Sequence, residues 1–302
     1  MGSCDHPAKR MLPWQFPLIF LLWLAPGAWA ADYSFITIDY PGAKSTSARG
    51  INDAGDIAGS YTDAGGVIHA FLLKDGKFLS SDFPGAKATI GTAINNAGEI
   101  VGYYTDAGGK VRGYLLNKGV FTSIDVPDAT ETNCWGINNK GDIAGMYVAP
   151  DKMHRPFVWS QGRFTLLEQH PDSSLMTCAF GINDEGVLVG HITDKTRNGQ
   201  DRGWVRSKGS YTLINPPGYT GWGANDAMGI GPSGDIVGRY QDAQGKWEGF
   251  VLGKSGFTSL EPPGATRTLL QKINRLGEIV GNYSDSGGKT HGVLVRPTRA
   301  AK

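Results

Sequence analysis

The sequence predicts an all-β protein: a six-bladed β-propeller with four strands per blade, closed by pairing of the N-terminal strand with the C-terminal blade. Three observations predict this fold. A unit of about 43 residues recurs six times, turn residues occupy fixed positions in each unit, and the two halves of the unit are offset at the chain ends. Repeats of roughly 40 to 50 residues with four short strands are typical of propeller blades.

Each repeat is marked by an isoleucine that opens a tight hairpin. These isoleucines are Ile51, Ile94, Ile137, Ile182, Ile230 and Ile273, at steps of 43, 43, 45, 48 and 43 residues. A glycine follows every isoleucine after four residues, and a second glycine follows after eight. The repeats therefore start near residues 50, 93, 136, 181, 229 and 272.

The first repeat shows how one unit yields four strands. The β-prone runs "SARGIN" and "DIAGSY" flank the turn Asn52-Asp53-Ala54-Gly55. Asn and Asp bend the chain through bonds to nearby backbone, and Gly accepts a positive φ, so this turn predicts a hairpin. After the turn "TDAGG", the runs "VIHAFLL" and "FLSSDF" supply the third and fourth strands.

The third strand of each repeat carries the strongest burial signal. Its six versions read "AFLL", "GYLL", "PFVW", "GWVR", "GFVL" and "GVLV". A strand that is apolar on both faces is covered on both faces, as in blades packed side by side. The glycine eight residues after the isoleucine then marks a place where another backbone comes close.

The chain ends predict closure of the ring. The first proline link, "FITIDYPGAKSTSAR", has no hairpin ahead of it, and the last hairpin unit ends at "HGVLV" without a fourth strand. Pairing these two segments would complete the sixth blade and remove an unpaired edge. The alternative is an open solenoid.

Residues 1–30 read as a secretory signal peptide, with a retained N-terminal anchor as the alternative. Lys9 and Arg10 precede the apolar run "PLIFLLWLAPGAWA", which ends in an A-x-A site. Residues 31–302 are then a single domain, secreted or periplasmic. The formal net charge of +1 gives no sign of the basic surface that nucleic-acid binding requires. No membrane insertion is expected after cleavage of the signal peptide. We expect a monomer without a cofactor.

At His69-Ala70-Phe71 the sequence resembles the HAF family of extracellular repeat proteins. The likeness rests on this tripeptide, on the "GIN-x-x-G-x-I-x-G" hairpin and on fourth strands like "FTSIDVPDA", and it covers nearly all of residues 31–302. The resemblance implies export and a repeat architecture. It implies no reaction, and no catalytic residue can be carried over from it.

One position of the third strand forms a predicted polar rim. It holds His69, Arg112, Arg155, Arg202, Glu248 and His291. One interpretation is a ring that grips an anionic ligand such as an acidic glycan. The favoured interpretation is that these side chains form hydrogen bonds across the seams between blades, because residues two apart in a strand share a face.

Two cysteines remain after the signal peptide. Cys134 and Cys178 both enter innermost strands of adjacent blades, so a disulfide between them is predicted, with two separately buried thiols as the alternative. No metal site is expected from them, because two cysteines without clustered histidines offer too few ligands. The turn with Asp53 and Asp56 offers too few carboxylates for calcium.

Departures from the repeat predict a recognition face. The longest link, residues 215–229, and its neighbours bring together aromatic and polar side chains suited to sugar rings or peptides. The predicted ligand-binding residues are Trp135, His170, Phe180, Tyr219, Trp222, Asn225 and Asp226. Alternatively, Trp135 and Phe180 only plug the axial channel. Their repeat position is held elsewhere by Arg49, Thr92, Met228 and Gln271.

The sequence favours a non-catalytic binding or scaffold module for glycan or protein. No G-x-S-x-G, HExxH or phosphate-loop motif is present. The alternative is an extracellular hydrolase or lyase acting on polysaccharide, in which the fold would gather Asp226, His170 and His191. We assign no catalytic residue from the sequence.

Overall fold

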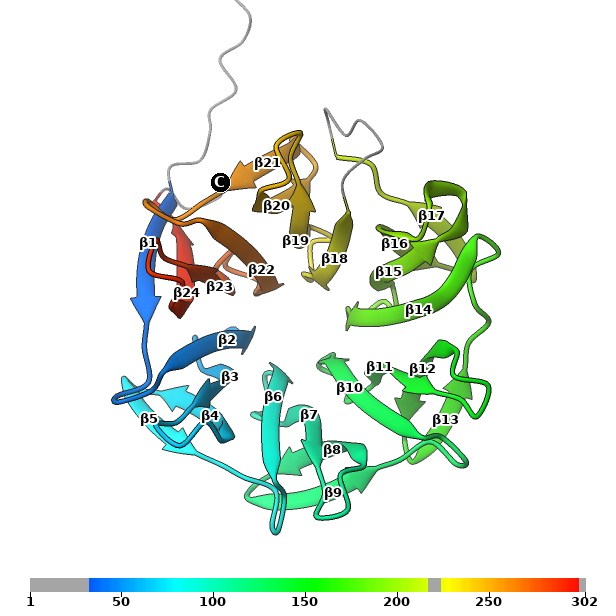
Figure 1. Cartoon of the computed structure of the whole chain (residues 1–302), viewed down its shortest axis with the longest axis horizontal. Helices are drawn as coiled ribbons and strands as arrows, with labels where there is room; N and C mark the ends of the chain where they lie inside the picture. Colours follow the sequence, from blue (N-terminus) through cyan, green and yellow to red (C-terminus); the bar gives the residue numbers. More distant parts are fainter. Residues whose placement is uncertain (1–32, 217–223, 299–302) are drawn as a thin grey trace, which may run out of the picture. The chain divides into compact units, whose positions relative to one another are not determined.

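The computed structural model describes residues 33–216 and 224–298, so the predicted signal peptide lies outside the described residues. The described chain is all-β apart from one short 3-10 turn, Lys195–Arg197. Its sheets are arranged as a propeller-like ring (Figure 1). Among the described residues, no helix is long and apolar enough to cross a membrane.

Five sheets make up the ring. Four of them have four strands each: β2 (Ser45–Ile51), β3 (Ile57–Thr62), β4 (Ile68–Lys74) and β5 (Lys77–Ser80); β6 (Ala88–Ile94), β7 (Ile100–Thr105), β8 (Val111–Asn117) and β9 (Val120–Ile124); β18 (Asn225–Ile230), β19 (Ile236–Gln241), β20 (Trp247–Gly253) and β21 (Gly256–Leu260); β22 (Arg267–Ile273), β23 (Ile279–Ser284), β24 (Thr290–Pro297) and β1 (Tyr33–Ile38). The fifth has eight: β10 (Glu131–Ile137), β11 (Ile143–Val148), β12 (His154–Ser160), β13 (Arg163–Leu166), β14 (Ser173–Ile182), β15 (Leu188–Asp194), β16 (Gln200–Ser207) and β17 (Ser210–Leu213).

The eight-stranded sheet consists of two antiparallel groups, β10–β13 and β14–β17. A single parallel pair, His154 with Met176, joins the two groups. Within each group the strands pair in the same order as in the four-stranded sheets.

The predicted pairing of the chain ends is present. β1 runs antiparallel to β24 from Tyr33 opposite Pro297 to Ile38 opposite Gly292. Segments at opposite ends of the described chain therefore share one sheet, and the edge of β24 is covered.

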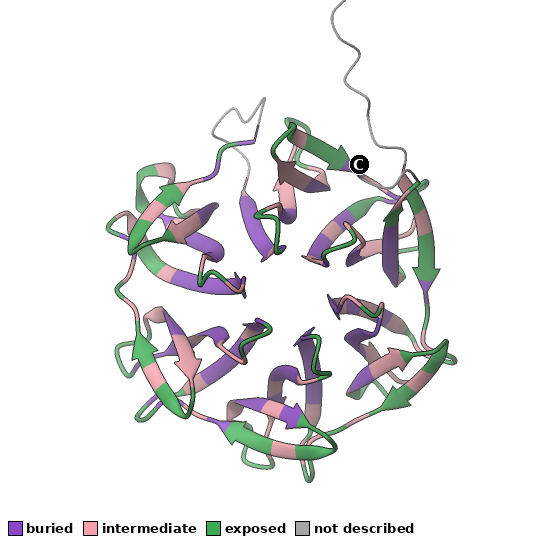
Figure 2. Ribbon diagram, turned by 180° about the vertical axis from the view of Figure 1, so that it is seen from behind, coloured by how far each residue is buried: buried purple, intermediate pink, exposed green. Residues whose placement is uncertain are grey.

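The core lies between neighbouring sheets. Among the described residues, its five largest fully buried side chains come from third strands: Phe71, Tyr114, Phe157, Trp204 and Phe250. The remaining third strand, β24, contributes the smaller Val293, which is 1% exposed. One cluster shows how residues of two sheets share the core: Phe71 of β4 packs with Ile38 of β1 and Val280 of β23, both from the neighbouring sheet. Figure 2 shows the same distribution, with buried residues concentrated on the inner strands and exposed residues on the outer ones.

The glycine eight residues after each isoleucine lies against backbone, as the repeat predicts. A Cβ built on Gly59, Gly102, Gly145, Gly190, Gly238 or Gly281 would lie 1.8–2.2 Å from a carbonyl oxygen of the innermost strand. No side chain fits at this separation, so the sheet requires glycine there.

The hairpins between first and second strands are linked to one another. In the first hairpin, Asn52 Oδ1 accepts from the N–H groups of Ala54 and Asp56, and Gly55 has a φ of +81°. The Nδ2 group of Asn52 then donates to the carbonyl oxygen of Asn95 in the next hairpin, at 3.4 Å. The same bond runs from Asn95 to Asn138, from Asn138 to Asn183 and from Asn274 to Asn52.

We call this row of bonds the hairpin belt, formed by Asn52, Asn95, Asn138, Asn183 and Asn274 with the residues that follow them. A parallel row joins the backbone N–H of each following residue to the next side chain, for example Asp53 to Asn96 at 2.9 Å. The fifth hairpin has Gly231 and Pro232 at these positions. Within the described residues, neither kind of bond connects it to its neighbours.

Candidate functional site

Every innermost strand has a β-bulge at the same repeat position. The pairing register shifts around one residue in each of β2, β6, β10, β14, β18 and β22. The bulged residues are Arg49, Thr92, Trp135, Phe180, Met228 and Gln271, which we call the axial ring. A bulge re-aims a side chain, and these strands lie nearest the centre (Figure 1).

The axial ring combines apolar surface with hydrogen-bond donors. Trp135 and Phe180 meet edge to face at 5.2 Å, and Phe180 packs with Met228. Three of the ring's side-chain nitrogens are buried and have no hydrogen-bond partner among residues 33–216 and 224–298: Arg49 Nε, Trp135 Nε1 and Gln271 Nε2. Buried donors are normally satisfied, so three such donors around one axis suggest groups that a ligand would meet.

Lys272 follows the ring residue of β22 at a position held elsewhere by Gly or Ala. Its Nζ donates to the carbonyl oxygens of Phe180 (3.1 Å) and Met228 (2.8 Å). Lys272 also lines a hollow, open to solvent, that the hairpins surround. Burial, assisted by the positive charge of Arg49, lowers the pKa of Lys272 to about 7.

Lys272→Met is expected to raise the melting temperature most at pH 6 and progressively less toward pH 10. Between pH 7 and about 10.5 the unfolded chain holds a proton at Lys272 that the folded protein lacks. Stability therefore rises with pH in this window for the wild type, and the methionine variant lacks that rise. Thermal melts across the pH range test this. Lys77→Met on exposed β5 is the matched control, and equal pH profiles for both variants would contradict the prediction.

A charged cluster lies between β15 and β18, behind Phe180 of the axial ring. His191 Nδ1 is 2.6 Å from Asp226 Oδ1, and Arg239 Nε donates to Asp226 Oδ2 at 2.5 Å. Asp226 is fully buried. Burial alone would raise the pKa of Asp226, but His191 and Arg239 lower it to about 2. Burial would lower the pKa of His191, yet Asp226 holds it well above its usual range.

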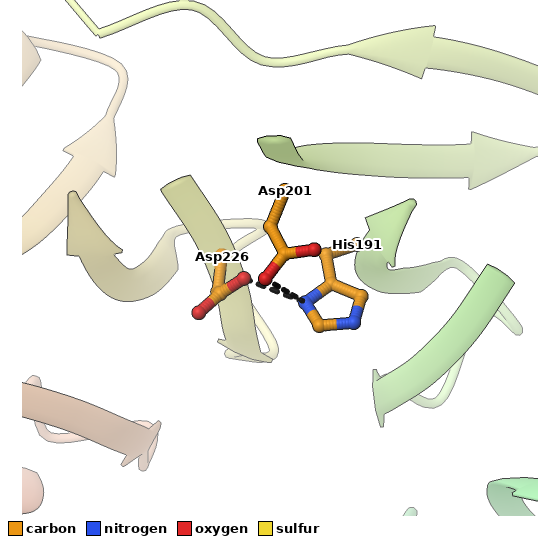
Figure 3. A group of neighbouring side chains, drawn as sticks. All are labelled: His191, Asp201 and Asp226. Atoms are coloured by element: carbon orange, nitrogen blue, oxygen red, sulfur yellow. Dashed lines mark hydrogen bonds and ion pairs between the residues drawn. The ribbon is translucent and has the colours of Figure 1, made fainter. Parts of the chain in front are cut away.

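Asp201 and Cys178 complete this seam cluster. Asp201 Oδ2 lies 4.0 Å from His191 Nδ1, so both carboxylates approach the same ring nitrogen (Figure 3). Cys178 is paired with His191 across the β14–β15 ladder. Burial would raise the pKa of Cys178, but His154 and His191 hold it below the usual value. We define the seam cluster as Cys178, His191, Asp201, Asp226 and Arg239.

The hydrolase or lyase alternative expected the fold to gather Asp226, His170 and His191. The structure pairs Asp226 with His191 and leaves His170 bonded to Asp172 and Thr177. Their partners Cys178, Asp201 and Arg239 were not predicted, although the repeat contains a signal for them. His191 and Arg239 occupy one repeat position, nine residues after the isoleucine, where the other units have Ser60, Tyr103, Met146 and Asn282. Cys178 and Asp226 share the position four residues before the isoleucine. Only in the fourth and fifth repeats are both of these otherwise variable positions held by Asp, His, Arg or Cys.

The predicted disulfide is wrong. Cys134 and Cys178 are both free and buried. The Cys134 sulfur packs against Gly113 of β8, whereas Cys178 belongs to the cluster of Phe180 and Met228. The two thiols therefore lie in different seams.

The predicted hydrogen bonds of the polar rim across blade seams are also wrong. Each rim side chain is bonded to residues in, or at the ends of, the strands of its own sheet. His69 contacts Asp63 and Asp82, and Arg112 contacts Asp106 and Asp125. Arg155 binds Asp151, Arg202 binds Asp194 and Asn215, Glu248 accepts from Tyr240 and Ser259, and His291 contacts Asp39 and Asp285. These side chains do not reach across the seams because carboxylates in the turn before the third strand and in the link after the fourth strand lie beside the rim position on the same sheet.

The predicted recognition-face residues occupy several places. Trp135 and Phe180 belong to the axial ring, and Asp226 belongs to the seam cluster. Asn225 is buried and accepts from the backbone of Gly203. His170 lies in the link before β14, where its backbone N–H donates to Thr177 and its ring meets Tyr211. Tyr219 and Trp222 lie outside the described residues.

Known proteins resemble the chain in fold and not in sequence. No protein-family model matches it, and no curated protein matches it. The fungal lectin of Aleuria aurantia, described as a six-bladed β-propeller with a novel fucose recognition mode, is 12% identical with a TM-score of 0.51, over 86% of this chain and 93% of the lectin.

Two further solved structures are similar to the same degree. The SapL1 lectin, in complex with α-methyl fucoside, is 12% identical with a TM-score of 0.54, over 86% of this chain and 97% of the lectin. TolB from Acinetobacter baumannii is 13% identical with a TM-score of 0.54, over 80% of this chain and 65% of TolB. At such identities the likeness shows the fold alone: the chain has an all-β, propeller-like fold shared with lectins and TolB.

Proposed function

We propose that this chain is an exported, non-catalytic binding module that holds a sugar residue of a glycan at the axial ring. The observation that carries the proposal is the set of three unpartnered donors, on Arg49, Trp135 and Gln271, around the aromatic side chains of Trp135 and Phe180. Sugars present an apolar ring face and several hydroxyl oxygens, and this combination suits both.

Six blades of four strands are part of the proposal. The eight-stranded sheet divides into β10–β13 and β14–β17, which one residue pair joins. Treated as two blades, these groups bring the number of blades to the number of sequence repeats. The lectin of Aleuria aurantia, described as six-bladed, supports the same number.

Export is proposed from the leader-like residues 1–30, and it agrees with the resemblance to the HAF family. Both imply a secreted or periplasmic protein, where extracellular glycans are available as ligands. The lectin structures support the ligand class, because their bound molecules are fucosides.

The alternative of a polysaccharide hydrolase or lyase receives less support from the site. Asp226 has one oxygen bonded to His191 and the other to Arg239, and it is fully buried. A carboxylate in this state is not free to act as nucleophile or base. His170, the third residue of that hypothesis, is engaged with Asp172 and Thr177 instead.

Glycan arrays and calorimetry with methyl glycosides, α-methyl-L-fucoside among them, test the proposal. The wild-type chain is expected to bind one class of glycan. Trp135→Ala should weaken binding at least roughly tenfold, because it removes the stacking surface and the Nε1 donor together. Trp135→Phe should give an intermediate loss, since it removes the donor but keeps an aromatic stacking surface.

Trp159→Phe is the matched control. Trp159 is a half-buried tryptophan on β12 that packs against a core cluster and is not part of the axial ring. It should leave affinity unchanged. Absence of binding to any glycan, or equal binding by Trp135→Ala and wild type, would refute the assignment of the axial ring.

A further inference from the structure

The seam cluster contains three metal-ligand side chains that converge on one point. One donor atom each from His191, Asp201 and Asp226 lies within 4.8 Å of the other two. Figure 3 shows the two carboxylates on the same edge of the imidazole, with Asp201 on β16 and Asp226 on β18. The three residues lie on β15, β16 and β18, which belong to two neighbouring groups of strands. No local sequence motif therefore identifies them as a set.

From this geometry we propose that His191 Nδ1, Asp201 and Asp226 bind one divalent transition-metal ion of the Zn²⁺ class. This inference is independent of glycan binding at the axial ring.

The distances suit such an ion after small movements. Zinc lies about 2.0–2.2 Å from nitrogen and carboxylate ligands, which places neighbouring ligand atoms roughly 3–3.6 Å apart. His191 Nδ1 is now 2.6 Å from Asp226 and 4.0 Å from Asp201. When an ion replaces the proton between His191 and Asp226, the distance from His191 Nδ1 to Asp226 increases. The distance from His191 Nδ1 to Asp201 decreases.

Two other histidines of the described chain have two carboxylates each and lack this convergence. His69 meets Asp82 at Nδ1 and Asp63 at Nε2. His291 likewise meets Asp39 at Nδ1 and Asp285 at Nε2. In both, the carboxylates lie on opposite edges of the ring and cannot share one ion with it. Only at His191 do both carboxylates face the same nitrogen.

The surroundings resemble the outer shell of a metal site. Arg239 holds the second oxygen of Asp226, which leaves Oδ1 for the ion. The other ring nitrogen, His191 Nε2, is buried and has no hydrogen-bond partner in the described structure. Cys178 lies beside the His191 side chain, across the β14–β15 ladder. Metal-bound histidines commonly use their second ring nitrogen for an outer-shell hydrogen bond. Asp201, with 28% of its side chain exposed, gives the ion a path from solvent.

The donor set selects the class of ion. Calcium and magnesium prefer oxygen ligands alone, whereas one imidazole with two carboxylates suits zinc and related transition metals. Three protein ligands leave at least one coordination position for water or a ligand atom.

Calorimetric titration of the chelator-treated full chain with Zn²⁺ tests the proposal. We expect one bound ion and a rise in melting temperature on adding Zn²⁺. Asp201→Asn should weaken binding at least roughly tenfold. Because Asp201 is partly exposed, this variant should melt like the wild type in the absence of metal, which separates loss of a ligand from misfolding.

Asp63→Asn, beside His69 on the rim, is the matched control and should retain the full stoichiometry. Cys178→Ser should weaken binding less than Asp201→Asn does, since the ion is assigned to the Nδ1 edge of His191. No uptake at millimolar Zn²⁺, or undiminished uptake by Asp201→Asn, would overturn the proposal. Loss of binding in Cys178→Ser but not in Asp201→Asn would place the ion on the sulfur side and overturn it equally.

Discussion

Replacing Gly190 with alanine is expected to abolish cooperative folding of the protein. The new Cβ would lie 1.8 Å from the carbonyl oxygen of Cys178 and 2.7 Å from the Trp204 ring. Neither neighbour can move away, because β14 is fixed by its ladder to β15 and Trp204 is fully buried. We expect a loss of more than about 4 kcal/mol of unfolding free energy, or no soluble protein.

Gly65→Ala is the control for this substitution. Gly65 lies in the exposed turn between β3 and β4, and a Cβ there meets only the Asp63 side chain at 3.3 Å. Its unfolding midpoint in urea should stay within about 0.5 kcal/mol of the wild type. If Gly190→Ala unfolds at the wild-type midpoint as well, the close approach described for the second strands is wrong.

Removing β1 is expected to lower the melting temperature by roughly 10 °C or more and to cause self-association. β1 pairs with β24 along six residues, and its Ile38 is buried with Phe71 in the core between sheets. Without β1, the whole edge of β24 presents unpaired N–H and C=O groups, and such edges recruit other chains. A chain that starts at Lys44 tests this by thermal melting and size-exclusion chromatography.

A chain that starts at Asp32 is the control and should behave like the full chain. A synthetic peptide of residues 33–43 should restore the melting temperature of the shortened chain, because an added strand can complete a sheet edge. A shortened chain that stays monomeric with an unchanged melting temperature would show that the β1–β24 pairing does not stabilise the ring.

The hairpins, the glycine positions and the pairing of the chain ends could be predicted because each depends on local backbone chemistry or on the offset of the repeat. The disulfide prediction failed for a reason that the same repeat contains. Cys134 stands three residues before its isoleucine and Cys178 stands four before. Successive residues of a strand point to opposite faces, so the two thiols face different neighbours.

The seam cluster could not be predicted in the same way. Its contacts depend on how β15 of one strand group meets β18 of the next, and sequence spacing does not encode that distance. Asp226 was singled out for its place in a long link, and it was grouped with His191 and His170 only as a catalytic set. Its buried bonds to His191 and Arg239 come from packing between sheets. Lys272 was missed although the repeat carries its signal, since a long side chain replaces Gly or Ala at an otherwise small position.

The hairpin belt gives the ring a direction that its sheets do not have. The bonds run from Asn274 through Asn52, Asn95 and Asn138 to Asn183, and Gly231 and Pro232 take no part in them. The coupling through these hairpin bonds is thus a line with two ends rather than a circuit. The fifth repeat of the sequence lies between the two ends of that line, and it is joined to its neighbours by ionisable side chains instead: the His191–Asp226 pair on one side and the bond from Lys272 to the Met228 carbonyl oxygen on the other.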